Sequence, residues 1–407
     1  MMIELLKGVK VVDFTTMVAA PAAAKMMADW GAEVVKVEAP GGEVLRVLGA
    51  SMGAPAKAEE NPIFDLYNAN KKGVTLDLKT SAGLEVMDRL IAWADIFISN
   101  VRLESLRKLG LDYATLSAKY PSLVWTHFSG YGLQGEEAGR PGYDMAAYWS
   151  RGGFVADLSP EGEHPLHLPT GIGDGICGLA LLSGTLGALR QAEQTGQGQE
   201  VRVSLYGTAI YANGVQVIST QYQDVFPKPY HRPTSPLMHS YRTKNDEIMV
   251  IVLPVHDKGY PQLMKLLERE DLIADERYAT QAAMANSQYK EELTHILEEA
   301  FAQFDSQTLS ERFLAADITF ERARHFEEIA HDPQAQANHY LYDYQFANGN
   351  HAQMPTSPVQ FSDNLDMPYQ AAPLVGENNQ EVLEALGYGA EEITALKDQG
   401  AFGKSRR

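Results

Sequence analysis

Residues 9–38, with the sequence VKVVDFTTMVAAPAAAKMMADWGAEVVKVE, decide the fold class because they contain a complete strand–helix–strand unit. The β-branched run at 9–14 predicts a strand, and residues 21–30 are strong helix formers that begin with a proline. Gly31 ends this helix, and the apolar run at 33–38 predicts the next strand. A strand, a helix and a second strand in succession indicate a βαβ unit with parallel strands.

The same rhythm continues through the first half of the chain. Further strands are predicted at residues 74–78, 96–99, 123–128 and 200–205, and helices at 81–94 and 173–192. We therefore predict an α/β fold whose large domain is built on a Rossmann-like parallel sheet.

A second, smaller domain is expected after the sheet. Four prolines within residues 226–236 indicate a linker, and they are followed by a predicted strand at 247–253 and an acidic helical segment at 263–304. We predict a large domain formed by residues 1–222 and 326–407, and a small α+β domain at 223–325.

Composition excludes several classes of protein. The 407 residues are 45% hydrophobic and carry a net charge of −19, which excludes global disorder and argues against nucleic-acid binding. The single cysteine, Cys177, excludes a disulfide framework and indicates a reducing compartment. Because no basic leader and no uninterrupted apolar stretch of about 18 residues occur, we expect a cytoplasmic protein without membrane association. The eleven histidines are scattered, so no metal site is predicted.

Residues 173–178 match the dinucleotide-binding pattern G-x-G-x-x-G letter for letter. That function requires a buried strand directly before the first glycine, and residues 164–170 do not predict one. A carboxylate at Asp174 would also repel a pyrophosphate. We therefore reject a dinucleotide site here.

Asp174 itself is unusual, because it lies among Gly171, Gly173 and Gly175 at the start of an apolar helix. One interpretation is a helix N-cap, for which aspartate is a preferred residue. The other is a carboxylate nucleophile, with glycines that let a ligand approach and a helix N-terminus that favours the ionised form. The residues alone leave both interpretations open.

Many short segments lie in the order in which one known family has them. They are residues 6–14, 20–21, 30–38, 41–46, 68–79, 94–100, 109–110, 129–132, 142–144, 173–174, 195–199 and 376–377. Together they resemble the class III CoA-transferase family, which includes formyl-CoA transferase and carnitine CoA-transferase. The resemblance covers nearly the whole chain and implies an interlocked homodimer.

The resemblance implies that Asp174 is the covalent nucleophile, acting through an acyl-aspartyl anhydride and an aspartyl-CoA thioester, with Gly173 and Gly175 at the oxyanion. It implies small-molecule partners, an acyl-CoA and a carboxylic acid, and no tightly bound cofactor or metal, since CoA is a substrate. The residues that it places at CoA are Met17, Val18, Ala19, Arg46, Lys71, Lys72, Asn100, Val101, Arg107, Lys108 and Tyr131.

Two departures narrow the function. Val18 stands where formyl-CoA transferase has a glutamine, and the glycine-rich flap of that enzyme is missing, so oxalate and formate are not the expected pair. The segment Gly142-Tyr143-Asp144 replaces the Gly-His-Asp of α-methylacyl-CoA racemases, and a phenol is a poor base near neutral pH. CoA transfer is therefore favoured, with a racemase or epimerase as the alternative and a non-catalytic CoA-binding protein as a third possibility.

A subgroup is also indicated. Residues 61–64, 70–73, 95–102 and 235–238 are similar to transferases of amino-acid-fermenting anaerobes that load 2-hydroxy acids with CoA. This similarity implies an acceptor such as 2-hydroxyisocaproate, phenyllactate or lactate.

Overall fold

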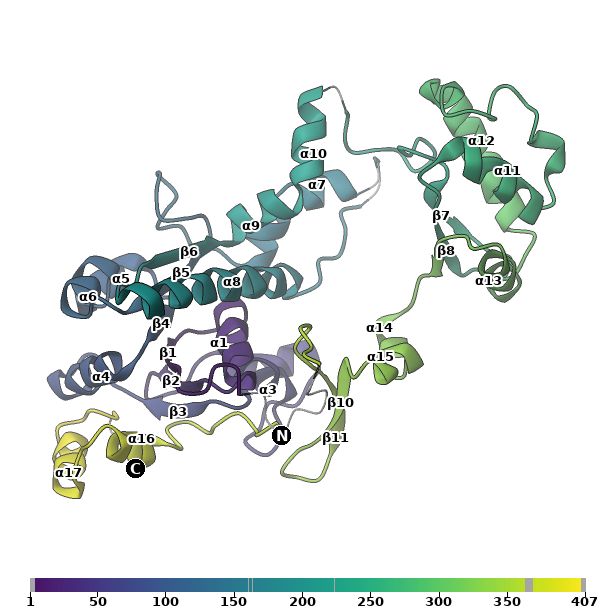
Figure 1. Cartoon of the computed structure of the whole chain (residues 1–407). Coiled ribbons are helices and arrows are strands. Elements are labelled where there is room, and N and C mark those ends of the chain that lie inside the picture. Colours follow the sequence, from purple (N-terminus) through teal and green to yellow (C-terminus); the bar gives the residue numbers. More distant parts are fainter. Residues whose placement is uncertain (1–3, 160, 163, 223, 363–368, 404–407) are drawn as a thin grey trace. The chain divides into compact units, whose positions relative to one another are not determined.

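The computed structural model describes residues 4–159, 161–162, 164–222, 224–362 and 369–403 (Figure 1). The chain divides into two compact units. Unit 1 comprises Met1–Gly153, Leu168–Ile218 and Pro333–Arg407, and unit 2 comprises Phe154–His167 and Ser219–Asp332. The range 223–325, expected as the small domain, falls inside unit 2, which also includes a short segment from the first half of the chain.

Unit 1 is built on a six-stranded parallel sheet with the strand order β3-β2-β1-β4-β5-β6. The strands are β1 (Lys10–Phe14), β2 (Glu33–Glu38), β3 (Lys72–Thr75), β4 (Ile96–Ser99), β5 (Val124–Ser129) and β6 (Glu200–Ser204). Strand β1 pairs with β2 on one side and β4 on the other, so the chain order reverses between β1 and β4. This confirms the predicted α/β fold with a Rossmann-like parallel sheet.

Helices cover both faces of the sheet, which explains why its strands are apolar on both sides. Helix α1 (Ala19–Asp29) packs against α8 (Ile172–Thr195), and α8 also contacts β5 and β6. A core of buried side chains joins β1, β2 and β5 to five further helices of the unit. These helices are α4 (Ser81–Trp93), α5 (Leu103–Leu109), α6 (Tyr113–Lys119), α16 (Asn379–Ala385) and α17 (Ala390–Asp398). The C-terminal segment therefore completes the large unit.

The other elements of unit 1 are short. They are α2 (Leu45–Leu48), α3 (Pro62–Asn68), α9 (Leu205–Ala212), most of α10 (Gly214–Ser219), α15 (Pro333–Ala337) and the hairpin β10 (Leu341–Gln345) and β11 (His351–Pro355). A π-helical segment at Asp144–Ser150 precedes α8 in the chain. Such segments are rare and frequently occur at functional sites.

Unit 2 has its own core around a three-stranded antiparallel sheet of β7 (Met238–Arg242), β8 (Ile248–Val252) and β9 (Phe320–Arg322). Its helices are α7 (Phe154–Leu158), α11 (His256–Leu266), α12 (Ser287–Phe301), α13 (Ser306–Ala315) and α14 (Phe326–Ile329). The helical segment predicted at 263–304 is in fact interrupted. Glu268 adopts a φ of 58° just after α11, and Asn286 caps a new helix at α12. Residues 267–286 form turns and two short 3-10 helices, Glu270–Leu272 and Ala283–Ala285.

Helix α8 is the one element of the described residues that is long and apolar enough to cross a membrane by length and composition. This is weak evidence for a membrane span, because core helices pass the same test. Leu181 and Leu182 of this helix are buried, and α8 packs on α1 and the sheet. Its apolar character is explained by that packing, and the cytoplasmic location stays a prediction.

Candidate functional site

A cavity of about 440 Å³ opens at the carboxyl ends of β1, β4 and β5. Its walls include Thr16 and Met17 after β1, Asn100 after β4 and Gly130 after β5, and Asp174 from α8. In open parallel sheets, ligands bind where the strand order reverses, outside the carboxyl ends of the strands. The cavity lies at that position, between β1 and β4.

Asp174 is the third residue of α8 and is half-buried in this cavity. The N-cap of α8 is Gly171, which has a φ of 87° and no side chain that could cap the helix. The interpretation of Asp174 as a helix cap is therefore wrong. Its carboxylate belongs to the cavity wall instead.

The side chain of Asp144 forms a hydrogen bond with the main chain at the start of α8. Its buried carboxylate accepts a hydrogen bond of 2.9 Å from the N–H of Gly171. A Cβ atom on Gly173 would lie 2.2 Å from Oδ1 of Asp144 and 2.4 Å from the ring of Tyr148. Only glycine fits at this position, so Gly173 brings the two carboxylates Asp144 and Asp174 close together.

The carboxylate of Asp144 affects the protonation of Asp174. Burial, together with the negative charge of Asp144, raises the pKa of Asp174 to about 7. Burial also raises the pKa of Asp144 itself. We expected the positive end of α8 to favour an ionised Asp174, but desolvation outweighs that effect. Asp144 is a residue that the sequence reasoning missed, although it follows the tyrosine that was considered.

The loop after β1 forms a wall of the cavity in a strained conformation. Met17 has a φ of 70°, which is uncommon for a residue with a side chain. Its N–H donates a hydrogen bond of 2.7 Å to Oε2 of Glu43, and Glu43 forms a buried ion pair of 2.7 Å with Lys36. Met17, Val18 and Ala19 all line the cavity, where the resemblance places CoA.

Three arginines bring positive charge to the cavity wall: Arg102, Arg107 and Arg140. Arg107 is among the residues expected to contact CoA. Arg140 was missed, because it lies in a loop without a recognisable motif. Its guanidinium pairs with Glu137 at 2.7 Å and lies 5.0 Å from the ring centroid of Tyr131. Tyr131, which was expected at CoA, is not among the residues that line the cavity.

The buried lysine expected at CoA, Lys71, lies elsewhere. Its ammonium donates to Asp13 at 2.8 Å, to the carbonyl of Pro21 at 2.9 Å and to Asn68 at 3.0 Å. These three hydrogen bonds use all its donors. The structure therefore assigns Lys71 to a buried ion pair beneath the β1 loop, and our proposal for CoA binding does not include it.

Other expected contacts also lie outside the cavity lining. Arg46 forms a two-fold ion pair with Glu38 and stacks on Phe64. The remaining basic residues pair with nearby carboxylates: Lys72 with Glu33 and Glu381, and Lys108 with Glu104.

Main-chain groups of Val101 and Gly175, two residues expected at the site, form hydrogen bonds within the fold. The carbonyl of Val101 accepts a hydrogen bond from Nε2 of His127 at 2.8 Å. The N–H of Gly175 donates to the carbonyl of Gly171 at 2.9 Å as a normal helical bond. Our proposal therefore gives no oxyanion role to Gly175.

Comparisons with known proteins identify the family to which this chain is similar. A family model described as CoA-transferase family III matches residues 6–379. The chain is 39% identical over 394 residues to (R)-2-hydroxy-4-methylpentanoate CoA-transferase of Clostridioides difficile, covering 97% of this chain and 98% of the relative. It is 38% identical over 397 residues to cinnamoyl-CoA:phenyllactate CoA-transferase of Clostridium sporogenes, covering 97% and 96%. A CAIB/BAIF family protein from Brucella suis has a similar structure, with a TM-score of 0.79 and 26% identity over 94% of this chain and 99% of that chain.

Proposed function

The chain belongs to CoA-transferase family III, and we propose that it moves CoA from an acyl-CoA to a 2-hydroxy carboxylic acid through covalent intermediates on Asp174. The observation that carries this proposal is the position of Asp174, half-buried in a cavity at the reversal point of the parallel sheet. There a thioester can reach the carboxylate while the walls limit access of water. That limit matters because anhydrides and thioesters hydrolyse.

The first half-reaction releases the donor acid. A carboxylate oxygen of Asp174 attacks the thioester carbonyl, the C–S bond breaks, and CoA leaves as a thiolate while an acyl-aspartyl anhydride forms. The thiolate then attacks the aspartyl carbonyl of the anhydride. The donor acid departs as its carboxylate, and an aspartyl-CoA thioester remains.

The second half-reaction runs these steps in reverse. The carboxylate of the acceptor acid attacks the aspartyl-CoA thioester and displaces the thiolate, which gives a new anhydride. The thiolate attacks the acceptor's acyl carbon, so the new acyl-CoA leaves and Asp174 regains its carboxylate. Each step exchanges one activated acyl bond for another, and no water is consumed.

The cavity wall supports an acceptor with an apolar side chain. Val18, Phe128, Leu133 and Leu205 contribute apolar surface to the lining. An alkyl or phenyl group gains free energy from burial against such surface, whereas formate and oxalate have no apolar group to bury. Together with the substrates in the relatives' names, this favours 2-hydroxy-4-methylpentanoate or phenyllactate.

The arginines of the wall support binding of CoA itself. A CoA molecule carries a pyrophosphate and a 3′-phosphate, so it needs positive charge in a chain whose net charge is −19. Arg102 and Arg107 provide guanidinium groups that can bind phosphate oxygens through two parallel hydrogen bonds, whereas Arg140 is paired with Glu137 at 2.7 Å.

We further propose that the chain forms a homodimer. Helices α9 and α10 expose Tyr211, Val215 and Ile218, with 88%, 75% and 59% of each residue accessible. Adjacent exposed apolar side chains of this size are typical of protein interfaces. Light scattering after gel filtration tests this proposal, because a homodimer should show twice the chain mass of 44.8 kDa. The interlocked arrangement stays an expectation from the resemblance.

The test of the covalent mechanism uses cinnamoyl-CoA as donor and phenyllactate or 2-hydroxy-4-methylpentanoate as acceptor, with oxalate as the comparison acid. Hydroxylamine added during turnover should convert Asp174 to a hydroxamate that peptide mass spectrometry locates. Asp174→Asn should lower the exchange rate on the order of a thousandfold or more. The exposed Glu136→Gln, next to the cavity loop, serves as the control. Full exchange by Asp174→Asn, or a hydroxamate on another residue, would refute the mechanism.

A further inference from the structure

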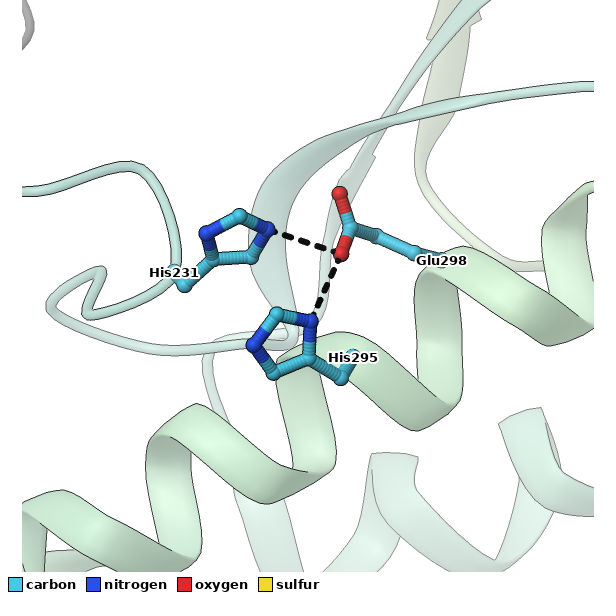
Figure 2. Close-up of side chains that lie close together, drawn as sticks. All are labelled: His231, His295 and Glu298. Carbon is cyan, nitrogen blue, oxygen red and sulfur yellow. Dashed lines mark hydrogen bonds and ion pairs between the residues drawn. The ribbon is translucent and has the colours of Figure 1, made fainter.

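Three metal-binding side chains lie together in unit 2, outside the cavity described above: His231, His295 and Glu298 (Figure 2). Their ligand atoms all lie within 4.8 Å of one another. Nε2 of His231 lies 2.9 Å from Oε2 of Glu298, and Nδ1 of His295 lies 3.2 Å from the same oxygen. The two imidazole rings stack with centroids 4.1 Å apart. One carboxylate oxygen is therefore approached by two imidazole nitrogens.

Two different segments build this cluster. His295 and Glu298 are three residues apart on α12, so they lie on the same side of the helix. His231 comes from the proline-rich segment 226–236, where its ring also packs edge-on against Tyr230. Because 64 residues separate the two histidines, the sequence spacing does not reveal the cluster.

We propose that His231, His295 and Glu298 bind a divalent transition metal ion, with Zn²⁺ the best match. Two imidazoles and one carboxylate are a common zinc ligand set, and a water molecule can supply the fourth ligand. Calcium and magnesium prefer sites made of oxygen atoms only, so this donor set does not suit them. This proposal departs from the sequence analysis, which expected no metal.

Two of the three distances between ligand atoms are close to those that a zinc ion requires, and the two imidazole nitrogens lie within 4.8 Å of each other. Zinc–ligand bonds of about 2.0–2.1 Å in a tetrahedron place neighbouring ligand atoms roughly 3.3 Å apart. The two nitrogen–oxygen distances of 2.9 and 3.2 Å need to widen by only a few tenths of an ångström. The ion takes the place of the hydrogen atom between each imidazole nitrogen and Glu298, and that proton passes through water to the other ring nitrogen. Each neutral imidazole then keeps a proton on its other ring nitrogen.

The surroundings allow the ion to enter. The side chains of His231, His295 and Glu298 are 42%, 52% and 31% exposed, so water reaches them. The nearby cation Arg232 is paired with Glu291 on α12 at 2.8 Å, so its charge is balanced. A bound ion would therefore link the segment 226–236 to α12 as a structural cross-link. It is independent of Asp174, since none of the three ligands lines the catalytic cavity.

The test uses the full chain without a polyhistidine tag, stripped with a chelator and then titrated with Zn²⁺. We expect about one zinc per chain by mass spectrometry of the element after gel filtration. The His231→Gln/His295→Gln double variant should lose it, and Glu298→Gln should weaken zinc affinity at least tenfold in competition with a chromogenic chelator. X-ray absorption of the zinc complex should report nitrogen and oxygen ligands at about 2.0 Å.

Two variants separate metal binding from loss of other contacts. Glu291→Gln breaks the Arg232 pair between the same two segments without removing a ligand, and His351→Gln removes an exposed histidine that bonds a single carboxylate, Asp343. Both should keep the wild-type zinc content. If zinc raises the melting temperature of the wild type, both variants should show the same rise. Zinc retained by the double variant, or no zinc retained by the wild type, would overturn the proposal. Because Glu298→Gln is a conservative change, its affinity remains measurable even if the double variant folds poorly.

Discussion

The side-chain amide of Asn100 holds the main chain of Thr16 from two sides. Its Oδ1 accepts a hydrogen bond from the Thr16 N–H at 3.0 Å, and its Nδ2 donates to the Thr16 carbonyl at 2.7 Å. This pair joins the loop after β1 to the end of β4, directly before the strained Met17. Asn100 therefore helps to hold the cavity wall at the reversal point of the sheet.

Asn100→Ala should loosen this loop. Two hydrogen bonds are lost, each with a net value of about 1 kcal/mol, so the free energy of unfolding should fall by about 1–3 kcal/mol. Because the loop lines the cavity, we expect the KM for acyl-CoA to rise more than kcat falls. Urea unfolding and initial rates measure both effects. Thr16→Ala keeps both main-chain hydrogen bonds, so a similar loss of stability in that variant would contradict the role of Asn100.

The two glycines that flank Asp174 should respond in opposite ways to alanine. At Gly173 the new Cβ meets Asp144 and Tyr148 at 2.2 and 2.4 Å, so Gly173→Ala should destabilise the protein by about 1–3 kcal/mol or more. At Gly175 nothing lies within 4 Å, so Gly175→Ala should stabilise α8 by about 0.5–1 kcal/mol. Thermal unfolding of the two variants compares them directly. Equal effects would show that the approach of Asp144 to α8 is not tight.

The rate of CoA transfer should depend on the ionisation of Asp174. Only the ionised carboxylate is a nucleophile, and its pKa is raised to about 7, so kcat/KM should fall as the pH drops through 7. Asp144→Asn removes the neighbouring negative charge, so it should move this midpoint to lower pH. Rates measured from pH 5 to 9 give the midpoint, and the same midpoint in both enzymes would contradict the coupling.

The raised pKa of Asp174 also predicts how stability varies with pH. In the unfolded chain its carboxyl ionises near its ordinary pKa of 3.8, but in the folded protein it ionises only near 7. Folding is therefore favoured by this group below about pH 4, and that contribution is lost as the pH rises to 7. Asp174→Asn carries no such dependence. The difference in free energy of unfolding, variant minus wild type, should therefore be larger at pH 8 than at pH 4. The same difference at both pH values would refute this account.

Removing the cavity arginines should weaken binding of CoA. Arg102→Ala and Arg107→Ala should each raise the KM for acyl-CoA several-fold, and the double variant should show a weaker dependence of KM on salt concentration. Lys119 is paired with Asp88 outside the cavity, so Lys119→Ala should leave KM unchanged. An equal rise in KM for the Lys119 variant would mean that the effect reflects net charge only.

Much of the architecture follows from the sequence alone. Residues 33–38 and 96–99 form the strands that their apolar runs predict, because both faces of this sheet are covered. The interruption between α11 and α12 in unit 2 does not follow from the sequence pattern. The positive φ at Glu268 follows the end of one helix, and the cap at Asn286 begins the next, although the composition between them favours helix.

Only some of the residues expected at the candidate site line the cavity. Met17, Val18, Ala19, Asn100, Arg107 and Asp174 line one cavity, and their roles in binding CoA and in catalysis stay predictions. A basic residue type in the sequence does not show which carboxylates will surround it. Lys71 is an example, because Asp13, Asn68 and a carbonyl use its donors within the core.

The sequence by itself determined the parallel sheet, the family and the acid among glycines. Each of these follows from residues that are close together along the chain, where periodicity and short motifs act. Only the tertiary structure decided the pKa of Asp174, the close approach of Asp144 and the cluster of His231 with His295 and Glu298. Those properties depend on burial and on charges brought together from distant segments, and neither is encoded in local spacing.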